Sequence, residues 1–514
     1  MLDEINIVWF KRDLRITDHL PIYRASIESL PFIPLYVLDQ KYWSQGFSSI
    51  RHWNFVYDCL EELNDELTKI GQPLIIKNGS AVEVFKNIQS IFKIKKVYKH
   101  EETSNDWVRK ENLSVKNWFD ENQIELIESP TNGVIRGLKS RDDWIKIKNQ
   151  RLLSDIIPKP LRLKKINNYK SDLISRKSII FEDDLIFNTQ KGGRKHGLKI
   201  LDTFLNLRSK SYLKNISSPK YSSEYCSRIS PYLTWGAISS KEVIKKVKHA
   251  KDLITKEDKY WKKNLTSFQS RLSWRCHFIQ KLEDDPTIEN LCMHKSFENL
   301  RVNSCNEQFF NAWKLGQTGY PFVDACMRNL INQGWITFRM RAMLVSFASY
   351  DLWLDWRDFA HHLAKLFTDY EPGIHYSQLQ MQSGVTGINT YRIYNPLKQS
   401  KEHDENGDFI KKWVPELQNL NSNWVHEPWK MDFETQKKLR CIIGKDYPHP
   451  VVDHKEAVSL AKSKIAEIRK EVNFKTIAKK VYTKHGSRNS NRDNNFVDSK
   501  LKKIKTNKQL SLSF

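Results

Sequence analysis

Two arginines and, further along the chain, two carboxylates and an imidazole are candidates for a binding site. Arg339 and Arg341 stand in the segment WITFRMR, and Asp369, Glu371 and His375 stand in DYEPGIH, which is typical of a loop. Carboxylates two residues apart need basic or hydroxyl partners. We expect Arg341 to pair with Asp369, leaving Glu371 and His375 to face a bound ring. A metal site would need a tighter cluster of histidines and carboxylates, so we predict no metal ion.

The segment SRISPYL is a second candidate, because it reads as the start of a helix. Ser230 stands at the expected cap position and Pro231 at the first helical position. The free backbone N–H groups there, with Ser227 and Arg228 beside them, are suited to a diphosphate. Most capped helices bind nothing, so an ordinary helix start is the alternative.

The segment FQSRLSWR places cations beside an aromatic ring. Phe268, Arg271 and Arg275 lie at helical spacing, and Trp274 follows Arg271 by three residues. Such a face suits stacking on a base while the arginines contact phosphate. A core tryptophan with surface arginines explains the same spacing.

These segments lie in a half of the chain that we expect to be helical. Amphipathic stretches rich in Trp and Arg follow Gly192, at residues 198–207, 239–249, 267–282 and 321–332. Before residue 130, short apolar runs at 5–10, 32–38, 74–77, 96–98 and 124–127 alternate with helical patterns at 52–70, 81–92 and 105–120. This alternation predicts an α/β fold with a doubly wound, Rossmann-like parallel sheet. No G-x-G-x-x-G motif follows the first strand, so the dinucleotide fingerprint is absent.

The chain divides into four expected segments. They are an N-terminal α/β domain at 1–130, an interdomain linker at 131–190, a larger all-helical domain at 191–484 and a basic tail at 485–514. The linker loses clear periodicity and carries Pro158 and Pro160. The tail has little that could form a core, so we expect it to be disordered.

Composition narrows the function classes. The 514 residues carry a formal net charge of +24, which favours a polyanionic partner, although abundant lysine across the chain is an alternative cause. No window approaches about 18 uninterrupted apolar residues, and the N-terminus does not look like a secretory signal. We therefore expect a cytoplasmic monomer without membrane contact. The seven cysteines lack a C-x-x-C pair and are expected to be reduced thiols.

The order of these segments resembles that of the DNA photolyase and cryptochrome family of FAD-dependent blue-light flavoproteins. The resemblance spans nearly the whole chain. Its markers are WFKRDLR at 9–15, SRISPYL at 227–233, WR at 274–275, TGYPFVDA at 318–325, DWR at 355–357, DYE at 369–371, RIYNP at 392–396 and WVPEL at 413–417.

The resemblance implies a U-shaped FAD in the helical domain, with its diphosphate on residues 227–230, which we call the 227–230 turn. The residues implied to bind the cofactor are Tyr212, Ser227, Arg228, Ile229, Ser230, Phe268, Arg271, Arg275, Arg341, Asp369, Glu371 and His375. Those implied to face damaged DNA are Arg271, Trp274, Arg339, Ala342, Met381 and Gln399. Trp274, His375 and Trp356 are the implied catalytic residues, with Trp356 in electron transfer and His375 a proton donor facing the flavin N5.

A photolyase passes one electron from light-excited reduced flavin to a pyrimidine dimer flipped out of DNA, and the split dimer returns the electron. The leading hypothesis is therefore a photolyase-like carbon–carbon lyase that repairs UV-damaged DNA. The alternative is a cryptochrome-type blue-light photoreceptor without repair activity. A third hypothesis, a DNA-binding protein with a nucleotide-binding domain such as a ligase, is disfavoured because no G-x-x-x-x-G-K loop is present.

Several positions depart from the family pattern. Arg271 stands where many members have Glu, Ala342 replaces a Met, and Met381 replaces a lesion-stacking Trp, which leaves cyclobutane against (6-4) specificity open. Leu379 occupies the proximal position of the three-tryptophan chain, and the distal region near Asn303 offers no Trp. Photoreduction must use another route or be poor.

Two further cofactors occur in the family. An antenna chromophore, a folate, a deazaflavin or another pigment, could sit at the sheet edge near HEETSNDW at 100–107. Members with an iron–sulfur cluster place four cysteines in the helical domain, an arrangement that the cysteine spacings here do not resemble.

Overall fold

A parallel sheet forms the N-terminal part of the molecule. The computed structural model describes residues 2–167, 169–181, 188–255, 257–389 and 391–486, so most of the tail expected to be disordered lies outside the described residues. The strands are β1 (Glu4–Phe10), β2 (Phe32–Leu38), β3 (Ile75–Asn78), β4 (Lys93–His100) and β5 (Glu125–Ser129), in the order β3-β2-β1-β4-β5. All four pairings are parallel, which confirms the predicted doubly wound sheet.

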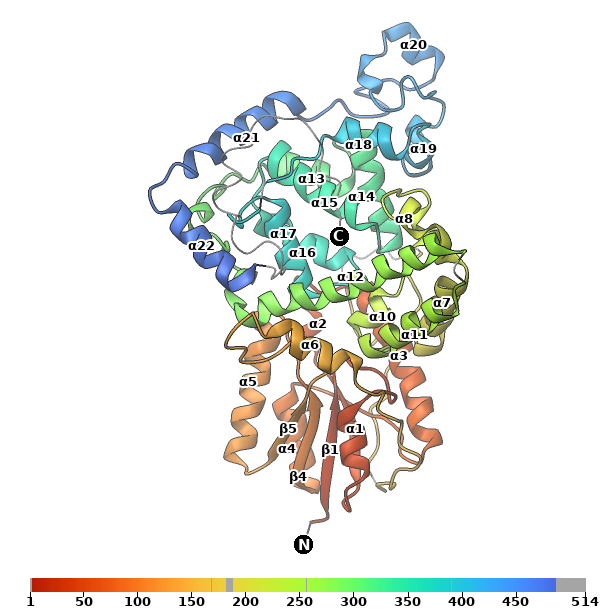
Figure 1. The fold of residues 1–514 in the computed structure, drawn as a ribbon, viewed down its shortest axis with the longest axis vertical. Helices are drawn as coiled ribbons and strands as arrows, with labels where there is room; N and C mark the ends of the chain where they lie inside the picture. Colours follow the sequence, from red (N-terminus) through yellow and green to blue (C-terminus); the bar gives the residue numbers. More distant parts are fainter. Residues whose placement is uncertain (1, 168, 182–187, 256, 390, 487–514) are drawn as a thin grey trace.

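Helices cover both faces of this sheet (Figure 1). They are α1 (Leu20–Ser26), α2 (Gln40–Trp43), α3 (Ile50–Lys69), α4 (Ala81–Ile91) and α5 (Asp106–Glu121). Successive residues of β1 point to opposite faces: Trp9 packs edge-on against Phe85 of α4, with ring centroids 5.2 Å apart, whereas Phe10 belongs to the core with α1 and α3. Burial on both faces explains why β1 is a continuous apolar run.

The rest of the chain is helical, as the amphipathic stretches predicted. The longer helices are α6 (Trp144–Leu153), α7 (Arg194–Asn206), α11 (Ser240–Leu253), α12 (Lys259–Asp284), α13 (Glu307–Leu315), α14 (Pro321–Gln333), α15 (Phe338–Ser346), α16 (Trp356–Leu366), α17 (Pro372–Gln382), α18 (Pro396–His403), α21 (His454–Ile468) and α22 (Phe474–His485). Shorter ones are α8 (Tyr212–Asn215), α9 (Ser222–Tyr225), α10 (Ser230–Thr234), α19 (Asp408–Trp413), α20 (Phe433–Lys438), η1 (Arg208–Ser211), η2 (Pro286–Glu289), η3 (Lys295–Phe297), η4 (Phe347–Asp351), η5 (Pro415–Leu417) and η6 (Pro428–Lys430). Helix α12 crosses the middle of the molecule and packs along α17 (Figure 1).

The loop after β1 joins the sheet to the helical part. The Leu14 N–H donates to the Trp235 carbonyl at 3.3 Å, and Arg15 Nη1 donates to the Gly236 carbonyl at 2.9 Å. Gly236 has φ +69°, and a Cβ there would lie 2.2 Å from the Arg12 carbonyl oxygen. Only glycine permits this approach, so the carboxyl edge of the sheet lies directly against the helices.

The structure bears on the expectations about membrane-spanning helices and about the cysteines. Within the described ranges, no helix is both long and apolar enough to cross a membrane. All seven cysteines are free thiols, and Cys305 alone among them is exposed.

Candidate functional site

The predicted pair of Arg341 and Asp369 is present. Arg341 Nη1 and Nη2 donate to Asp369 Oδ1 and Oδ2, each at 3.0 Å, and Arg341 Nε donates to the Ile336 carbonyl at 2.9 Å. The guanidinium also lies 4.2 Å from the centroid of the Phe367 ring. The two-pronged geometry fixes the segment before α17 to α15.

Glu371, which we expect to be left for a bound ring, is engaged with two arginines, Arg275 and Arg12. Its Oε2 accepts from Arg275 Nη2 at 2.7 Å, and its Oε1 lies 3.8 Å from Arg12 Nη1. Arg12 Nη2 also donates to the Tyr370 carbonyl at 2.6 Å. Glu371 therefore joins α12 to the loop after β1, a pairing between residues remote in sequence that spacing alone does not reveal.

His375 lies in helix α17 and not in the predicted loop. The sequence Pro372-Gly373 suggested a break, but proline is favoured in the first turn of a helix, where its missing N–H costs nothing. The ring is 7% exposed, and its Nε2 lies 2.9 Å from the Ala360 carbonyl. Burial lowers the pKa of His375 to about 3, so the ring is neutral and carries its proton on Nε2. Nδ1 is then a hydrogen-bond acceptor, which differs from the proton donor implied by the resemblance.

The 227–230 turn is positively charged. Helix α10 begins at Ser230 without a side-chain cap and follows Ile229, so Ser230 is not the predicted cap residue. Arg228 has φ +59°, its Nε donates to Gln190 Oε1 at 3.0 Å, and its guanidinium lies 4.1 Å from the Trp335 ring centroid. Burial lowers the pKa of Arg228 to about 10.

A second arginine, Arg208, forms hydrogen bonds with the backbone at the start of the same turn. Arg208 donates to the backbone carbonyls of Cys226 and Ser227, the latter at 3.4 Å. In the described part of the chain, the hydrogen-bond partners of the Arg208 and Arg228 side chains are neutral oxygens. Arg208 is thus fully engaged with neutral oxygens, whereas Arg228 is a buried cation on which the Asp369 carboxylate acts.

Tyr212, Phe268 and Arg271 lie together beside this turn. The rings of Tyr212 and Phe268 are 6.1 Å apart, and Arg271 forms a hydrogen bond with the Tyr212 hydroxyl. Phe268 is buried on α12, so that face of the helix points inward. The structure thus brings together three residues that the resemblance implies bind the cofactor.

The residues expected to face DNA come from four helices. Trp274 on α12 packs against His277 and Phe278, with ring centroids 5.3 and 5.7 Å apart. Arg339 on α15 donates from Nε to Ser217 Oγ at 3.0 Å, whereas Met381 and Gln399 lie on α17 and α18. Helices α12 and α15 both pack against α17.

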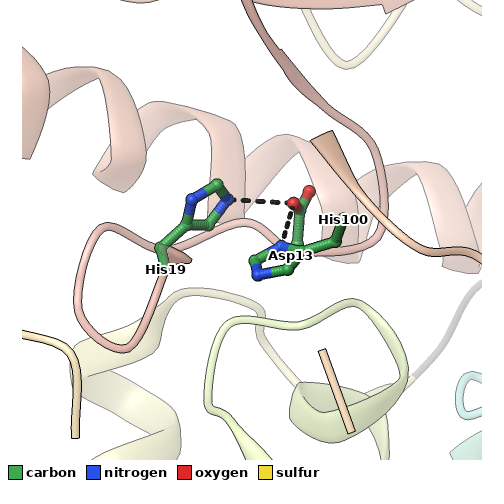
Figure 2. Close-up of side chains that lie close together, drawn as sticks. All are labelled: Asp13, His19 and His100. Carbon is green, nitrogen blue, oxygen red and sulfur yellow. Dashed lines mark hydrogen bonds and ion pairs between the residues drawn. The ribbon is translucent and has the colours of Figure 1, made fainter. Parts of the chain in front are cut away.

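Asp13, His19 and His100 form the one group of three potential metal ligands in the described residues (Figure 2). Asp13 Oδ2 lies 2.9 Å from His19 Nε2 and 2.7 Å from His100 Nδ1. The Ile22 N–H donates to His19 Nδ1 at 3.2 Å, which forces the His19 proton onto Nε2. Since a ring nitrogen that carries a proton cannot bind a metal ion, this geometry favours a buried hydrogen-bond network. Burial lowers the pKa of both histidines, that of His100 to about 3.

A cavity opens beside this cluster, at the carboxyl edge of the sheet. Its volume is about 60 Å³, which is room for a few water molecules, and it is partly open to solvent. Its charged lining residues are Lys11, Arg12, Asp13, Arg15, Lys99, Glu101, Glu102, Arg275 and Glu371. Residues 100–103 of the segment expected to lie near an antenna line this cavity.

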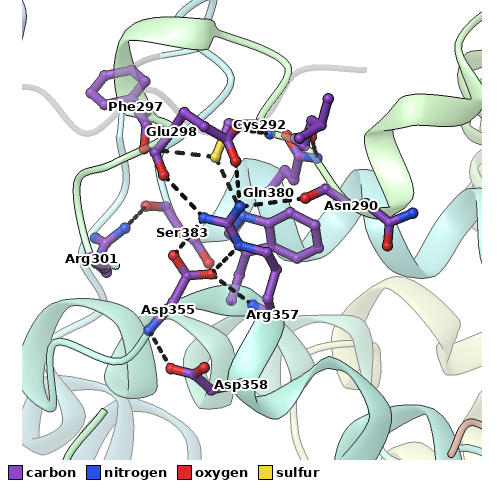
Figure 3. A network of polar contacts seen from close by, with 12 residues as sticks. Asn290, Cys292, Phe297, Glu298, Arg301, Asp355, Arg357, Asp358, Gln380 and Ser383 are labelled. Carbon is purple, nitrogen blue, oxygen red and sulfur yellow. Dashed lines mark hydrogen bonds and ion pairs between the residues drawn. The ribbon is translucent and has the colours of Figure 1, made fainter. Parts of the chain in front are cut away.

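Figure 3 shows a polar network that includes Asp355, Arg357 and Glu298 at the start of α16, the helix that begins with Trp356. The Trp356 Nε1–H donates to Cys292 Sγ at 3.5 Å, and the Arg357 guanidinium lies 5.5 Å from the Trp356 ring centroid. Arg357 pairs with both Asp355 and Glu298. Cys292 and Glu298 are remote in sequence from Trp356 and Arg357, so local spacing could not predict these contacts.

The protein joins an α/β domain with a parallel sheet to a helical domain that carries the 227–230 turn and the buried His375 ring. The model of the family described as DNA photolyase matches residues 6–137, and the model described as the FAD binding domain of DNA photolyase matches residues 268–467. This chain belongs to the DNA photolyase and cryptochrome family.

Individual relatives carry both kinds of name. A deoxyribodipyrimidine photo-lyase of Alkalihalophilus pseudofirmus is 27% identical over 90% of this chain and 98% of its own length. A cryptochrome DASH of Synechocystis is 26% identical over 90% of this chain and 98% of its own length. The crystal structure of a bacterial class III photolyase from Agrobacterium tumefaciens covers 92% of this chain and 99% of its own, with a TM-score of 0.78 and 24% identity. The likeness to the solved structure supports the fold.

Proposed function

We propose that this chain binds FAD in its helical part and uses it to repair pyrimidine lesions in DNA under blue light. The observation that carries the cofactor assignment is the 227–230 turn, where Arg208 and Arg228 are held by neutral oxygens. A diphosphate would add a negative charge beside Arg228, because the one carboxylate that acts strongly on this guanidinium, Asp369, is already paired with Arg341.

The other candidate residues are also compatible with bound FAD. Tyr212, Phe268 and Arg271 would lie beside the phosphates, and the Arg341–Asp369 pair and His375 would lie near the flavin ring. When bound, FAD supplies a light-driven one-electron donor. The Arg341–Asp369 pair would orient the ring, and the neutral His375 would accept a hydrogen bond at Nδ1 while Nε2 stays on the Ala360 carbonyl.

DNA is the proposed partner, with Trp274 and Arg339 as its proposed contacts. The formal net charge of +24 favours association with phosphates, and Trp274 offers a half-buried aromatic face for an unstacked base. The relatives named photo-lyase support this assignment.

Repair is tested with short duplexes that carry one cyclobutane dimer or one (6-4) lesion. The chemically reduced holoprotein should restore pyrimidines in blue light and not in the dark. Absence of restored pyrimidines for both lesions, with bound flavin present, would show that the chain is not a photolyase.

A blue-light photoreceptor is the second candidate function. Arg271, Ala342 and Met381 alter the wall expected to face a lesion, and a relative is named cryptochrome DASH. This role predicts bound flavin without lesion-selective DNA binding, which a competition between damaged and undamaged duplexes in the dark measures. The expected antenna stays a proposal, placed at the sheet edge near residues 100–107.

A further inference from the structure

A series of ring contacts connects Trp356 to His375. The Trp356 and Tyr376 rings lie 6.4 Å apart, and the Tyr376 and His375 rings lie 5.1 Å apart. The Tyr370 ring lies 5.1 Å from His375, and its hydroxyl donates to the Tyr376 hydroxyl at 3.4 Å. Leu379, at the position where the family pattern has a tryptophan, contributes no ring. Among the described residues, Tyr376 is therefore the ring that contacts both Trp356 and His375.

The Tyr376 hydroxyl has a base beside it. It forms a hydrogen bond with the carboxylate of Glu289, the last residue of η2. That carboxylate also accepts from the Asp106 N–H at 2.5 Å and is half-buried, whereas Tyr376 is 1% exposed. A phenol that loses an electron becomes a strong acid, so an adjacent carboxylate makes its oxidation easier.

Trp356 has no comparable acceptor. Its Nε1–H points to the thiol of Cys292, whose pKa is raised to about 12 by burial, and a neutral thiol is a weak acceptor. The Arg357 guanidinium near the ring also opposes a positive charge on the indole. An electron vacancy in this series is therefore more stable on Tyr376 than on Trp356.

We propose that Tyr376 is the electron relay that takes the place of the missing proximal tryptophan, with Glu289 as the acceptor of its proton. The inference rests on the proposed binding of FAD near His375. Tyr376 gives one electron to the light-excited oxidised flavin, its O–H bond breaks, and the proton moves to a Glu289 carboxylate oxygen. One electron from an external thiol, directly or through Trp356, then reduces the tyrosyl radical, and Glu289 returns the proton.

The test follows bleaching of the oxidised flavin in the holoprotein under blue light with dithiothreitol. Tyr376→Phe should keep its bound flavin and slow bleaching by about tenfold or more, the loss expected when a favourable electron donor is removed. Tyr350→Phe is the matched control, because Tyr350 is also buried and its hydroxyl has no hydrogen-bond partner in the described residues. It should be bleached at the wild-type rate.

Two further measurements separate the electron from the proton. Freeze-trapped, illuminated wild-type protein should show a tyrosyl signal in electron paramagnetic resonance that Tyr376→Phe lacks. Glu289→Gln should slow bleaching while Tyr376 is still present. A yellow Tyr376→Phe protein that is bleached at the wild-type rate overturns the relay alone, whereas a wild-type chain that holds no flavin overturns the proposed function and the relay with it.

Discussion

Arg341 and Asp369 are joined by two parallel hydrogen bonds of 3.0 Å each, between α15 and the residue that starts the turn into α17. The Asp369 side chain is 6% exposed and that of Arg341 is 23% exposed, so the pair is largely removed from water. Its geometry fixes the approach to the helix that carries His375 and Tyr376.

Replacement of Arg341 should destabilise the fold. Arg341→Gln leaves the Asp369 carboxylate buried without its partner, which costs roughly 3–5 kcal/mol for a buried pair. Urea unfolding of the protein measures the change. Lys437→Gln is the control, since the Lys437–Glu434 pair is 53% and 82% exposed and should contribute less than about 1 kcal/mol. Equal effects of the two changes would contradict a structural role for the Arg341–Asp369 pair.

His375 should make stability depend on pH. Burial lowers its pKa to about 3, so the folded ring stays neutral while the unfolded ring takes up a proton below its ordinary value of 6.5. Stability is therefore fully present above the unfolded pKa and falls as the pH decreases. His375→Asn should reduce the loss of unfolding free energy between pH 8 and pH 5 by about 2 kcal/mol.

The exposed His249 provides the control for this prediction. His249→Asn should leave the pH dependence of stability unchanged, because this ring is exposed on the surface of α11 and is not part of the core. A His375→Asn protein with the wild-type pH dependence would mean that the folded ring is protonated near neutral pH.

Gly236 should be sensitive to a single methyl group. Gly236→Ala combines a left-handed backbone, φ +69°, with a Cβ 2.2 Å from the Arg12 carbonyl oxygen. We expect a loss of more than about 2 kcal/mol, since left-handed strain alone costs roughly 1 kcal/mol. Gly137→Ala is the matched control, with φ +62° and no heavy atom within 4 Å of the added Cβ. Thermal melts of both variants that coincide would contradict the close contact.

Arg339 should contribute to DNA binding through phosphate contact. Arg339→Gln is expected to reduce the slope of log affinity against log salt by about 1, with similar weakening for damaged and undamaged duplexes. Fluorescence anisotropy at several salt concentrations measures this slope. Arg162→Gln, at an exposed position before α7, should leave it unchanged.

The sheet and the helices could be predicted from local patterns. The apolar run at residues 32–38 predicts a strand, and the structure gives β2 as Phe32–Leu38. The amphipathic stretch at residues 321–332 predicts a helix, and the structure gives α14 as Pro321–Gln333. Both signals are contained in a few neighbouring residues.

Of the contacts in the candidate site, only the ion pair between an acid and a nearby arginine could be predicted from the sequence. The acid of Asp369 required a cation, and Arg341 supplied it. The pairing of Glu371 with Arg275, 96 residues away, and the contact of Tyr376 with Glu289 depend on how α12 and η2 pack against α17, which no local spacing encodes. His375 was assigned to a loop because proline and glycine normally end helices, whereas here Pro372 begins one.

The central claim is that the helical part holds FAD on the 227–230 turn, and flavin content tests it most directly. The purified chain, reconstituted with FAD and freed of excess by gel filtration, is denatured and its released flavin is quantified per chain. We expect close to one FAD per chain for the wild type and a marked loss of bound FAD for Arg228→Gln. A wild-type chain that retains no yellow chromophore after reconstitution would contradict it.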